Sequence, residues 1–289
     1  MDARQRIERA LTTAIERVER PGAPPRLAGA MRHAIFPGGA RIRPRLTLAV
    51  AMACGEDAPD VTEAAAAAIE LLHCASLVHD DLPCFDDAAT RRGRPSVHRA
   101  YGEPLAVLAG DALIVLAFQT LAHGAALAPH RLAALLINVG AAVGAPNGIV
   151  AGQAWESEPK VELSVYHRAK TGVLFGAATT AGAMAVGAEP NAWRLLGERL
   201  GEAFQVADDL KDAVGDAEDI GKPVGRDAAL ARASAVADLG IAGAVALLER
   251  LVDEAVDSIP ACAGASELRT LMRREAMQFL PKRLARHAA

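Results

Sequence analysis

Four aspartates and three arginines stand close together where a long apolar stretch of the sequence ends. They are Asp80, Asp81, Asp86, Asp87, Arg91, Arg92 and Arg94. Carboxylates this close repel one another unless a cation lies between them, and Mg²⁺ prefers one or two carboxylates together with substrate phosphates. Guanidinium groups suit phosphate oxygens. The segment therefore predicts a site for a metal and a polyphosphate, and the alternative is an acidic loop that ends a helix.

A second acidic segment lies far along the chain, at the end of another helical stretch. Asp208 and Asp212 are four residues apart, so a helix presents both on one face, with Gln205 about one turn before Asp208. Asp209 stands between them. Two such segments are much less expected by chance than one. If they face each other, several Mg²⁺ ions can bridge them through one polyphosphate.

A glycine pair introduces a second group of arginines. Gly38 and Gly39 allow a tight turn and a close approach to a ligand, and Pro44 suits the first turn of a following helix. This turn carries Arg41, Arg43 and Arg45. A helix start already favours anions through its free amides, so the turn predicts an anion site, and the alternative is a solvated basic face.

Three further residues bear on these sites. His73 precedes Asp80 by seven residues, about two helical turns, so both point from one face. Pro83 must end the helix within a turn of Asp80, so the chain has to bulge and return the second acidic pair toward the first. Lys170 lies in an otherwise uncharged stretch that runs to Ala188. A buried lysine needs an anion, which is either a diphosphate or a carboxylate.

The composition favours helices throughout. Of 289 residues, 52% are hydrophobic but only 3% are aromatic, so alanine, leucine, valine and isoleucine must build the core and strand formers are scarce. The apolar spacing predicts helices at about 2–19, 26–35, 60–80, 103–123, 130–144, 161–187 and 192–214, with more from 228 to 286. Asp60, with Glu63 three residues later, is expected to cap the third of these. We predict one all-α domain over residues 1–289.

Several classes of function are disfavoured. The net charge is −4 and no basic stripe with aromatics occurs, which argues against a nucleic-acid partner. The four cysteines form no CxxC pair, so zinc and a disulfide framework are not expected and the chain is predicted to be cytoplasmic. The runs 112–130 and 132–155 are uncharged and long enough to span a membrane. Their polar residues and glycines favour buried helices instead, so no integral membrane segment is expected.

With these motifs in order, the chain resembles the trans-prenyltransferases, the polyprenyl diphosphate synthases. Its sequence at 36–44 (FPGGARIRP) and 151–158 (AGQAWESE) is similar to that of the geranylgeranyl diphosphate synthases of carotenoid-making bacteria. The resemblance implies an isoprenoid-synthase helical bundle around a central cavity, a homodimer, and two or three Mg²⁺ ions. It also implies the condensation of isopentenyl diphosphate with an allylic diphosphate.

The resemblance assigns roles by position. The metal ligands would be Asp80 and Asp86 with Asp81 and Asp87 in support, and Asp208 with Asp209 and Asp212 beside it. The allylic diphosphate would be held by Arg91, Lys170, Thr171, Gln205 and Lys222. Isopentenyl diphosphate would be held by Arg43, His73 and Arg92. The residues expected to be essential for catalysis are Asp80, Asp86, Asp208, Lys170 and Arg91.

Two positions bear on substrate and product. Many family members have a lysine where this chain has Ala40, so either Arg41 or Arg45 compensates or the affinity for isopentenyl diphosphate is weaker. In the family, the bottom of the pocket for the growing isoprenoid chain lies near the position of Ala75, with Ser76 beside it. Farnesyl-making relatives tend to have an aromatic residue there, so alanine predicts a C20 product. The alternatives are farnesyl diphosphate synthesis, a terpene cyclase, a non-catalytic subunit of a prenyl synthase and a plain helical scaffold.

Overall fold

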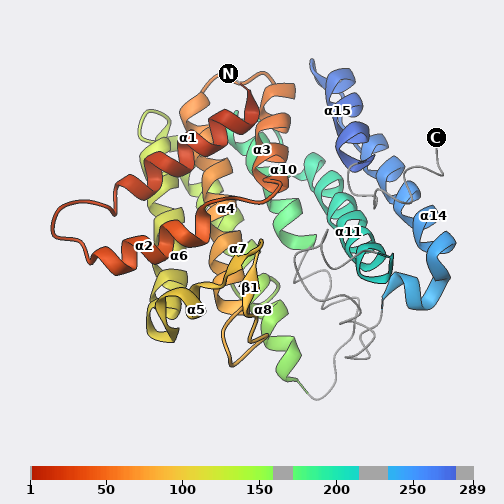
Figure 1. The fold of residues 1–289 in the computed structure, drawn as a ribbon. Helices are drawn as coiled ribbons and strands as arrows, with labels where there is room; N and C mark the ends of the chain where they lie inside the picture. The colour runs from red at the N-terminus through yellow and green to blue at the C-terminus, as the bar shows by residue number, and fades with distance from the viewer. Residues whose placement is uncertain (1, 159–171, 215–233, 278–289) are drawn as a thin grey trace. The chain divides into compact units, whose positions relative to one another are not determined.

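The computed structural model describes residues 2–158, 172–214 and 234–277. They divide into two compact units, each treated by itself below. Unit 1 comprises residues 1–52, 56–139 and 181–188, and unit 2 comprises residues 53–55, 140–180 and 189–289. Helices make up nearly all of both (Figure 1), which confirms the all-α prediction. The prediction of a single domain stays a prediction.

The elements keep the order in which the chain forms them. The first group is α1 (Ala3–Glu16), α2 (Pro25–Ile35), α3 (Ile42–Ala53), α4 (Pro59–Asp80), β1 (Thr90–Arg91), β2 (Arg94–Pro95), α5 (Val97–Tyr101) and α6 (Glu103–Gly124). The second is η1 (Pro129–Arg131), α7 (Leu132–Val143), α8 (Ile149–Ala154), η2 (Trp155–Ser157), α10 (Val173–Ala185), α11 (Asn191–Val214), α14 (Ala235–Asp257) and α15 (Ala265–Met277). The helices expected from the spacing are present among the described residues, and the parts of the prediction within 159–171, 215–233 and 278–289 lie outside them.

Unit 1 is built on the packing of α4 against α6, with α1 and α2 also in contact with this pair (Figure 1). The run from Ala64 to Ala68 is buried, and its small side chains let the helices approach closely. A Cβ placed on Gly124 would lie 2.2 Å from the Cβ of Ala64, so this crossing requires glycine. Alanine richness therefore serves close helix packing, as the scarcity of aromatic residues predicted.

The start of α4 differs from the expected capping box. Its N-cap is Ala58, and Asp60 lies within the first turn without a capping hydrogen bond. Glu63 instead accepts hydrogen bonds from Arg6 (2.9 Å) and Arg9 (2.7 Å) of α1. The cap prediction was wrong because Pro59 already suits the first helical position, and because tertiary ion pairs hold the carboxylate of Glu63.

A two-stranded antiparallel hairpin follows α4, and the sequence patterns did not predict it. Thr90 pairs with Pro95 and Arg91 with Arg94. The two turn residues, Arg92 (φ 53°) and Gly93 (φ 73°), are both left-handed, as the tight turns that best join twisted strands require. The hairpin is too short to show alternation, but it fixes the directions of Arg91 and Arg92.

Unit 2 packs α14 along α11. Leu200, Leu210 and Leu251 are among its buried side chains. At the other face of α11 the Phe204 ring lies 5.5 Å from that of Phe175 on α10. A Cβ on Gly197 would lie 2.4 Å from the Phe175 carbonyl oxygen, so α10 and α11 approach at a glycine.

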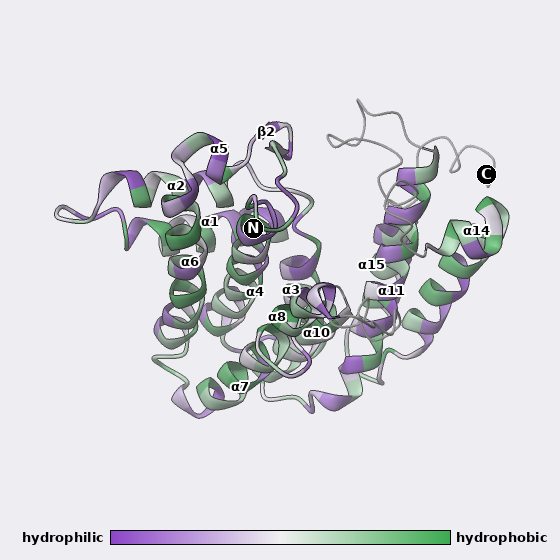
Figure 2. Cartoon of the chain, turned by 90° about the horizontal axis from the view of Figure 1, so that it is seen from below, coloured by the Kyte–Doolittle hydropathy of each residue, from purple (hydrophilic) through white to green (hydrophobic). Residues whose placement is uncertain are grey.

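Two helices of unit 1 are long and apolar enough to cross a membrane by composition alone. In α4, 83% of the most apolar window is buried, whereas in α6 the figure is 44%. Figure 2 shows α6 coloured as hydrophobic over much of its length. Burial within unit 1 accounts for α4, but α6 leaves Val107, Leu108 and Val115 exposed.

Candidate active site

The first acidic segment, residues 80–87, folds back on itself directly after α4. The helix ends at Asp80, and the Asp86 amide then donates a hydrogen bond to the Asp80 carbonyl oxygen at 2.9 Å. The Ala88 amide likewise donates to the Asp81 carbonyl oxygen. This confirms that Pro83 stops the helix and that the chain returns, so Asp80 and Asp86 lie beside each other at one end of α4.

The other two aspartates of this segment are held by basic side chains. Asp81 is buried and accepts hydrogen bonds from the Arg91 guanidinium. Burial alone lowers the pKa of Arg91, but the hydrogen bond to Asp81 and the nearby carboxylates outweigh it and raise that pKa. Asp87, which is half exposed, accepts from Arg99 at 3.0 Å. The side chains of Asp81 and Asp87 thus hold the segment through ion pairs, while Asp80 and Asp86 are joined by a backbone hydrogen bond.

A cationic cluster of Arg41, Arg43 and Arg92 lies in the same unit, around Glu70 and His73 of α4. Arg41 and Glu70 form a buried ion pair at 2.6 Å, and the Arg92 guanidinium is 3.8 Å from the same carboxylate. Burial, only partly opposed by the charge of Glu70, lowers the pKa of Arg43 to about 10. Arg43 still carries its charge at pH 7, so the cluster keeps an excess of positive charge suited to an anion.

Arg41 has a structural role in this cluster. Besides Glu70 it donates to Glu8 at 2.9 Å and to the Ile35 carbonyl oxygen at 2.9 Å, and it is buried. Its guanidinium is therefore committed to protein acceptors. Of the two residues considered to compensate for Ala40, Arg41 is excluded by these contacts, and Arg45 stays a prediction.

Gly38 and Gly39 leave space that the guanidinium groups of Arg41 and Arg92 occupy. A Cβ on Gly38 would lie 2.1 Å from the guanidinium carbon of Arg41. A Cβ on Gly39 would lie 3.1 Å from Nε of Arg92. Neither glycine has a positive φ, so the pair is needed for space around the arginines. The expected close approach of this turn to a ligand stays a prediction.

His73 is half-buried beside this cluster. Burial, followed by the positive charges of Arg43 and Arg92, holds the pKa of His73 well below 6.5. The imidazole is therefore neutral at pH 7. Two residues further along α4, Ala75 is fully buried, and Ser76 donates its hydroxyl hydrogen to the His73 carbonyl oxygen at 2.9 Å.

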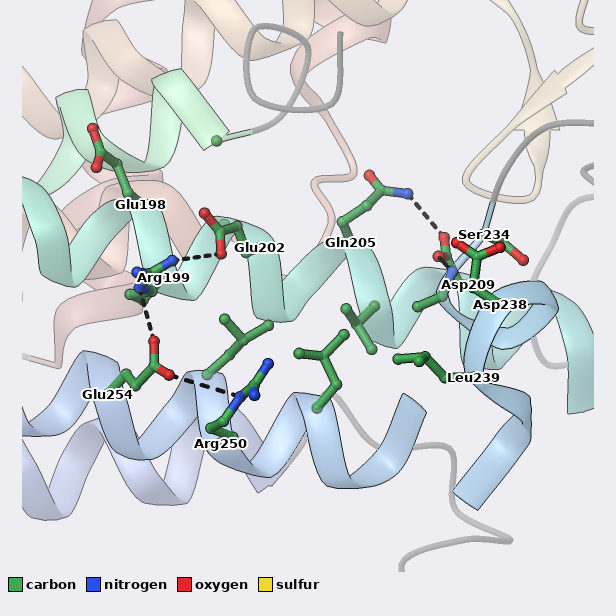
Figure 3. A pocket seen from close by; sticks show the side chains of 16 residues that line it. Glu198, Arg199, Glu202, Gln205, Asp209, Ser234, Asp238, Leu239, Arg250 and Glu254 are labelled. Atoms are coloured by element: carbon green, nitrogen blue, oxygen red, sulfur yellow. Dashed lines mark hydrogen bonds and ion pairs between the residues drawn. The ribbon is translucent and has the colours of Figure 1, made fainter. Parts of the chain in front are cut away.

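The second acidic segment, residues 205–212, lies in unit 2 on α11. Asp209 is buried and accepts a hydrogen bond from the Gln205 amide at 3.0 Å and from the Ala235 backbone at 2.8 Å. Ala235 is the first residue of α14, whose N-cap is Ser234. Figure 3 shows Gln205 directed toward Asp209 beside the start of α14. Asp209 therefore ties α11 to α14, whereas Asp208 and Asp212 are half-buried.

Gln205 and Asp209 also face a cavity of about 740 Å³ within unit 2. Its lining mixes charged side chains of α11 and α14, among them Glu198, Glu202 and Glu254, with apolar ones such as Val206 and Leu251 (Figure 3). Gln205 and Asp209 of the second acidic segment are part of this mixed lining.

The carboxylate-only donor set of both segments fits Mg²⁺. Among the described residues, no three His, Cys, Asp or Glu side chains form a group that could hold a metal by themselves. Mg²⁺ commonly takes one or two carboxylates and completes its shell with substrate phosphate and water. Lys170, Thr171 and Lys222 lie outside the described residues, and the facing of the two acidic segments stays a prediction.

Comparison with known proteins identifies the family. A family model described as polyprenyl synthetase matches residues 24–260. The chain belongs to the polyprenyl synthetase family. A geranylgeranyl diphosphate synthase from Cereibacter sphaeroides is 55% identical over 281 residues, covering 97% of this chain and 98% of that one. A farnesyl diphosphate synthase from Geobacillus stearothermophilus is 42% identical over 254 residues, or 84% of each chain.

A solved structure agrees with the family assignment. The geranyltransferase of Helicobacter pylori, complexed with magnesium and isoprenyl diphosphate, matches with a TM-score of 0.82 and 30% identity over 96% of each chain. As a polyprenyl synthetase, this chain is a prenyltransferase of isoprenoid biosynthesis. The resemblance first noted in the motifs is confirmed.

Some residues of the site were not found from the sequence. Glu70 neutralises part of the arginine cluster, and Glu8 of α1 holds the other side of Arg41. His98 is buried, bonds to Ser96 at 3.0 Å, and lies 3.5 Å from Asp87. Glu70 had a usable signal, since it is a lone acid in the apolar run of α4. The other two depend on tertiary contacts.

Proposed function

We propose that this polyprenyl synthetase condenses isopentenyl diphosphate with allylic diphosphates to give geranylgeranyl diphosphate, a C20 product. The observation that carries the proposal is the 55% identity to a geranylgeranyl diphosphate synthase over nearly the whole of both chains. The site agrees with it, because one unit presents a pair of adjoining aspartates together with a separate cluster of arginines.

The aspartates and Arg91 form the allylic side of this proposal. Asp80 and Asp86 sit side by side, and Arg91 is anchored by Asp81 with its charge assured. These carboxylates would hold Mg²⁺, which would supply positive charge to the allylic diphosphate as a leaving group. Arg91 adds a fixed positive charge where negative charge develops on the leaving group. The second acidic segment, through Asp208 and Asp212, is proposed to complete this grip.

The arginine cluster forms the second substrate site. Arg43 stays charged at pH 7 and, together with Arg92, binds the diphosphate of isopentenyl diphosphate, while neutral His73 contributes a hydrogen bond. Holding this diphosphate places the double bond near the allylic carbon, which it attacks as the first diphosphate leaves. The released diphosphate takes the proton that the product loses. The buried apolar residues of α4 exclude water, which would quench the cation.

Product length is set by the small residue above the first acidic segment. Ala75 lies five residues before Asp80, about 7.5 Å along the helix axis at 1.5 Å per residue. An alanine there leaves room for a longer chain than an aromatic residue does. This favours C20 over C15, although the 42% identity to a farnesyl diphosphate synthase keeps C15 as the alternative.

Further features of the proposal follow from the family and from α6. We propose two or three Mg²⁺ ions per site, a cytoplasmic location and a role in supplying carotenoid synthesis. The exposed apolar residues Val107, Leu108 and Val115 of α6 support a homodimer through that helix. Light scattering of the purified chain tests the dimer, and a monomer at micromolar concentration would contradict it.

The test of the proposed function is a product analysis. The purified chain receives Mg²⁺, isopentenyl diphosphate and farnesyl diphosphate, and diphosphate release and product length are measured. We expect C20 product, dependent on both substrates and abolished by a chelator. A supply of geranyl diphosphate that yields only C15 would favour the alternative synthase. No diphosphate release by the chain alone would favour a non-catalytic subunit.

A further inference from the structure

Two cysteines that are far apart in the sequence lie together in unit 2. Cys54 follows directly after α3, and Cys262 lies in the connection between α14 and α15. The Gly264 amide donates to the Ala53 carbonyl oxygen at 3.0 Å, so the two backbones touch. A Cβ on Gly264 would lie 2.7 Å from the Cα of Ala53. The Cys54 thiol is within hydrogen-bonding reach of the Cys262 thiol.

Both thiols are free and half-buried. This distinguishes them from Cys74, which is buried, and from Cys84, which is exposed and lies on the loop of the first acidic segment. A half-buried pair is reachable by a small oxidant, and each thiol has the other as its nearest reaction partner. A disulfide requires Cα atoms about 4.4–6.8 Å apart. The backbone contact beside the two cysteines and the hydrogen bond between their thiols are compatible with that spacing, and rotation about the Cα–Cβ bonds can bring the sulfurs together.

We propose that Cys54 and Cys262 form a reversible disulfide, a modification site that ties the end of α3 to the α14–α15 connection. The proposal does not depend on the proposed function. The oxidant is a small-molecule disulfide such as oxidised glutathione. Because thiols stay reduced in a glutathione-rich compartment, the bond forms when the oxidant accumulates.

The exchange balances in two steps. The Cys262 thiolate attacks the small disulfide and forms a mixed disulfide, releasing one small thiol. Cys54 then loses its proton to solvent and attacks the sulfur of Cys262, releasing the second small thiol. Two protein thiols are oxidised to one disulfide, and one small disulfide is reduced to two thiols. Burial raises the pKa of the Cys54 thiol to about 11, so little thiolate forms at pH 7 and the attack by Cys54 depends on the closeness of the Cys262 sulfur in the mixed disulfide.

The bond closes a very long loop of chain. Between Cys54 and Cys262 lie both acidic segments, the hairpin and most of the helices. A cross-link over such a loop removes much of the freedom of the unfolded chain. The oxidised protein is therefore expected to melt several degrees above the reduced protein.

The test treats the full-length protein with increasing oxidised glutathione and maps its peptides without reduction. We expect a linked pair of peptides that contain Cys54 and Cys262, a higher melting temperature, and reversal of both by dithiothreitol. Cys84→Ser is the matched control and keeps the effect. Cys262→Ser, placed in a half-buried connection, loses both the link and the temperature shift, and Cys54→Ser is expected to match it.

Two results would overturn the proposal. One is modification of Cys84 at oxidant concentrations that leave Cys54 and Cys262 as thiols. The other is a link that joins Cys54 or Cys262 to a different cysteine or to a second chain. If one of the serine variants does not fold, the peptide map of the parent protein still decides between these outcomes.

Discussion

Replacing Glu70 by glutamine tests whether the buried ion pair holds the anion-binding cluster together. The Arg41 and Glu70 side chains are 1% and 2% exposed, and their atoms are 2.6 Å apart. Removing one partner of a buried pair costs about 3–5 kcal/mol, because the other charge loses its compensation. Arg41 keeps Glu8 and the Ile35 carbonyl oxygen. We therefore expect the lower end, about 3 kcal/mol, or roughly 6 °C in melting temperature for a chain of this size.

The assay is thermal and urea unfolding of the purified variant beside a matched control. Glu19→Gln removes an ion pair of the same 2.6 Å length with Arg32, whose side chains are 28% and 42% exposed. This control is expected to lose less than about 1 kcal/mol. The reasoning would be refuted if Glu70→Gln melted within 1 °C of the parent protein, as a roughly 0.5 kcal/mol effect would require, or no lower than the control.

The remaining predictions concern the acidic segments, the chain pocket and pH. Asp208→Asn is expected to lower kcat by about 10²-fold or more, whereas Asp209→Asn should cost about 1–2 kcal/mol of stability. A kcat of Asp208→Asn close to that of the parent protein, or a melting temperature of Asp209→Asn equal to it, would contradict these roles. Ala75→Tyr should shift the product from C20 toward C15, and an unchanged length distribution would reject Ala75 as the pocket floor. Because the pKa of His73 is lowered in the folded chain, only the unfolded chain binds a proton at His73 just below pH 6.5. The free energy of unfolding therefore falls as pH drops below about 6.5. His73→Gln should flatten that part of the melting-temperature profile, and an identical slope in both proteins would count against it.

The helices could be predicted because their signal is local. The apolar spacing in α4, α6 and α11 depends only on residues a few positions apart, and the structure places these helices close to the predicted bounds. The start of α4 was misjudged because Glu63 is used by α1, which no local pattern reveals. The hairpin at Thr90–Pro95 was missed because two-residue strands carry no periodicity.

The sequence predicted which residue types form the site, but it predicted less well the contacts that hold them in place. The return of Asp86 to Asp80 followed from one proline, because a proline within a turn of the helix end leaves the chain few routes. The commitment of Arg41 to Glu8 and Glu70 did not follow, since both acids come from elsewhere in the fold. For the same reason Asp209 looked like a metal ligand, although its carboxylate also caps α14.

The central claim is that the two acidic segments grip one diphosphate through metal ions. The most direct measurement is a crystal structure of the chain with Mn²⁺ in place of Mg²⁺ and a non-cleavable thio analogue of farnesyl diphosphate, with the metals located by anomalous scattering. The account predicts ions bound by Asp80 and Asp86 on one side and by Asp208 on the other, joined by the same diphosphate. A diphosphate held by only one of the two segments would contradict it.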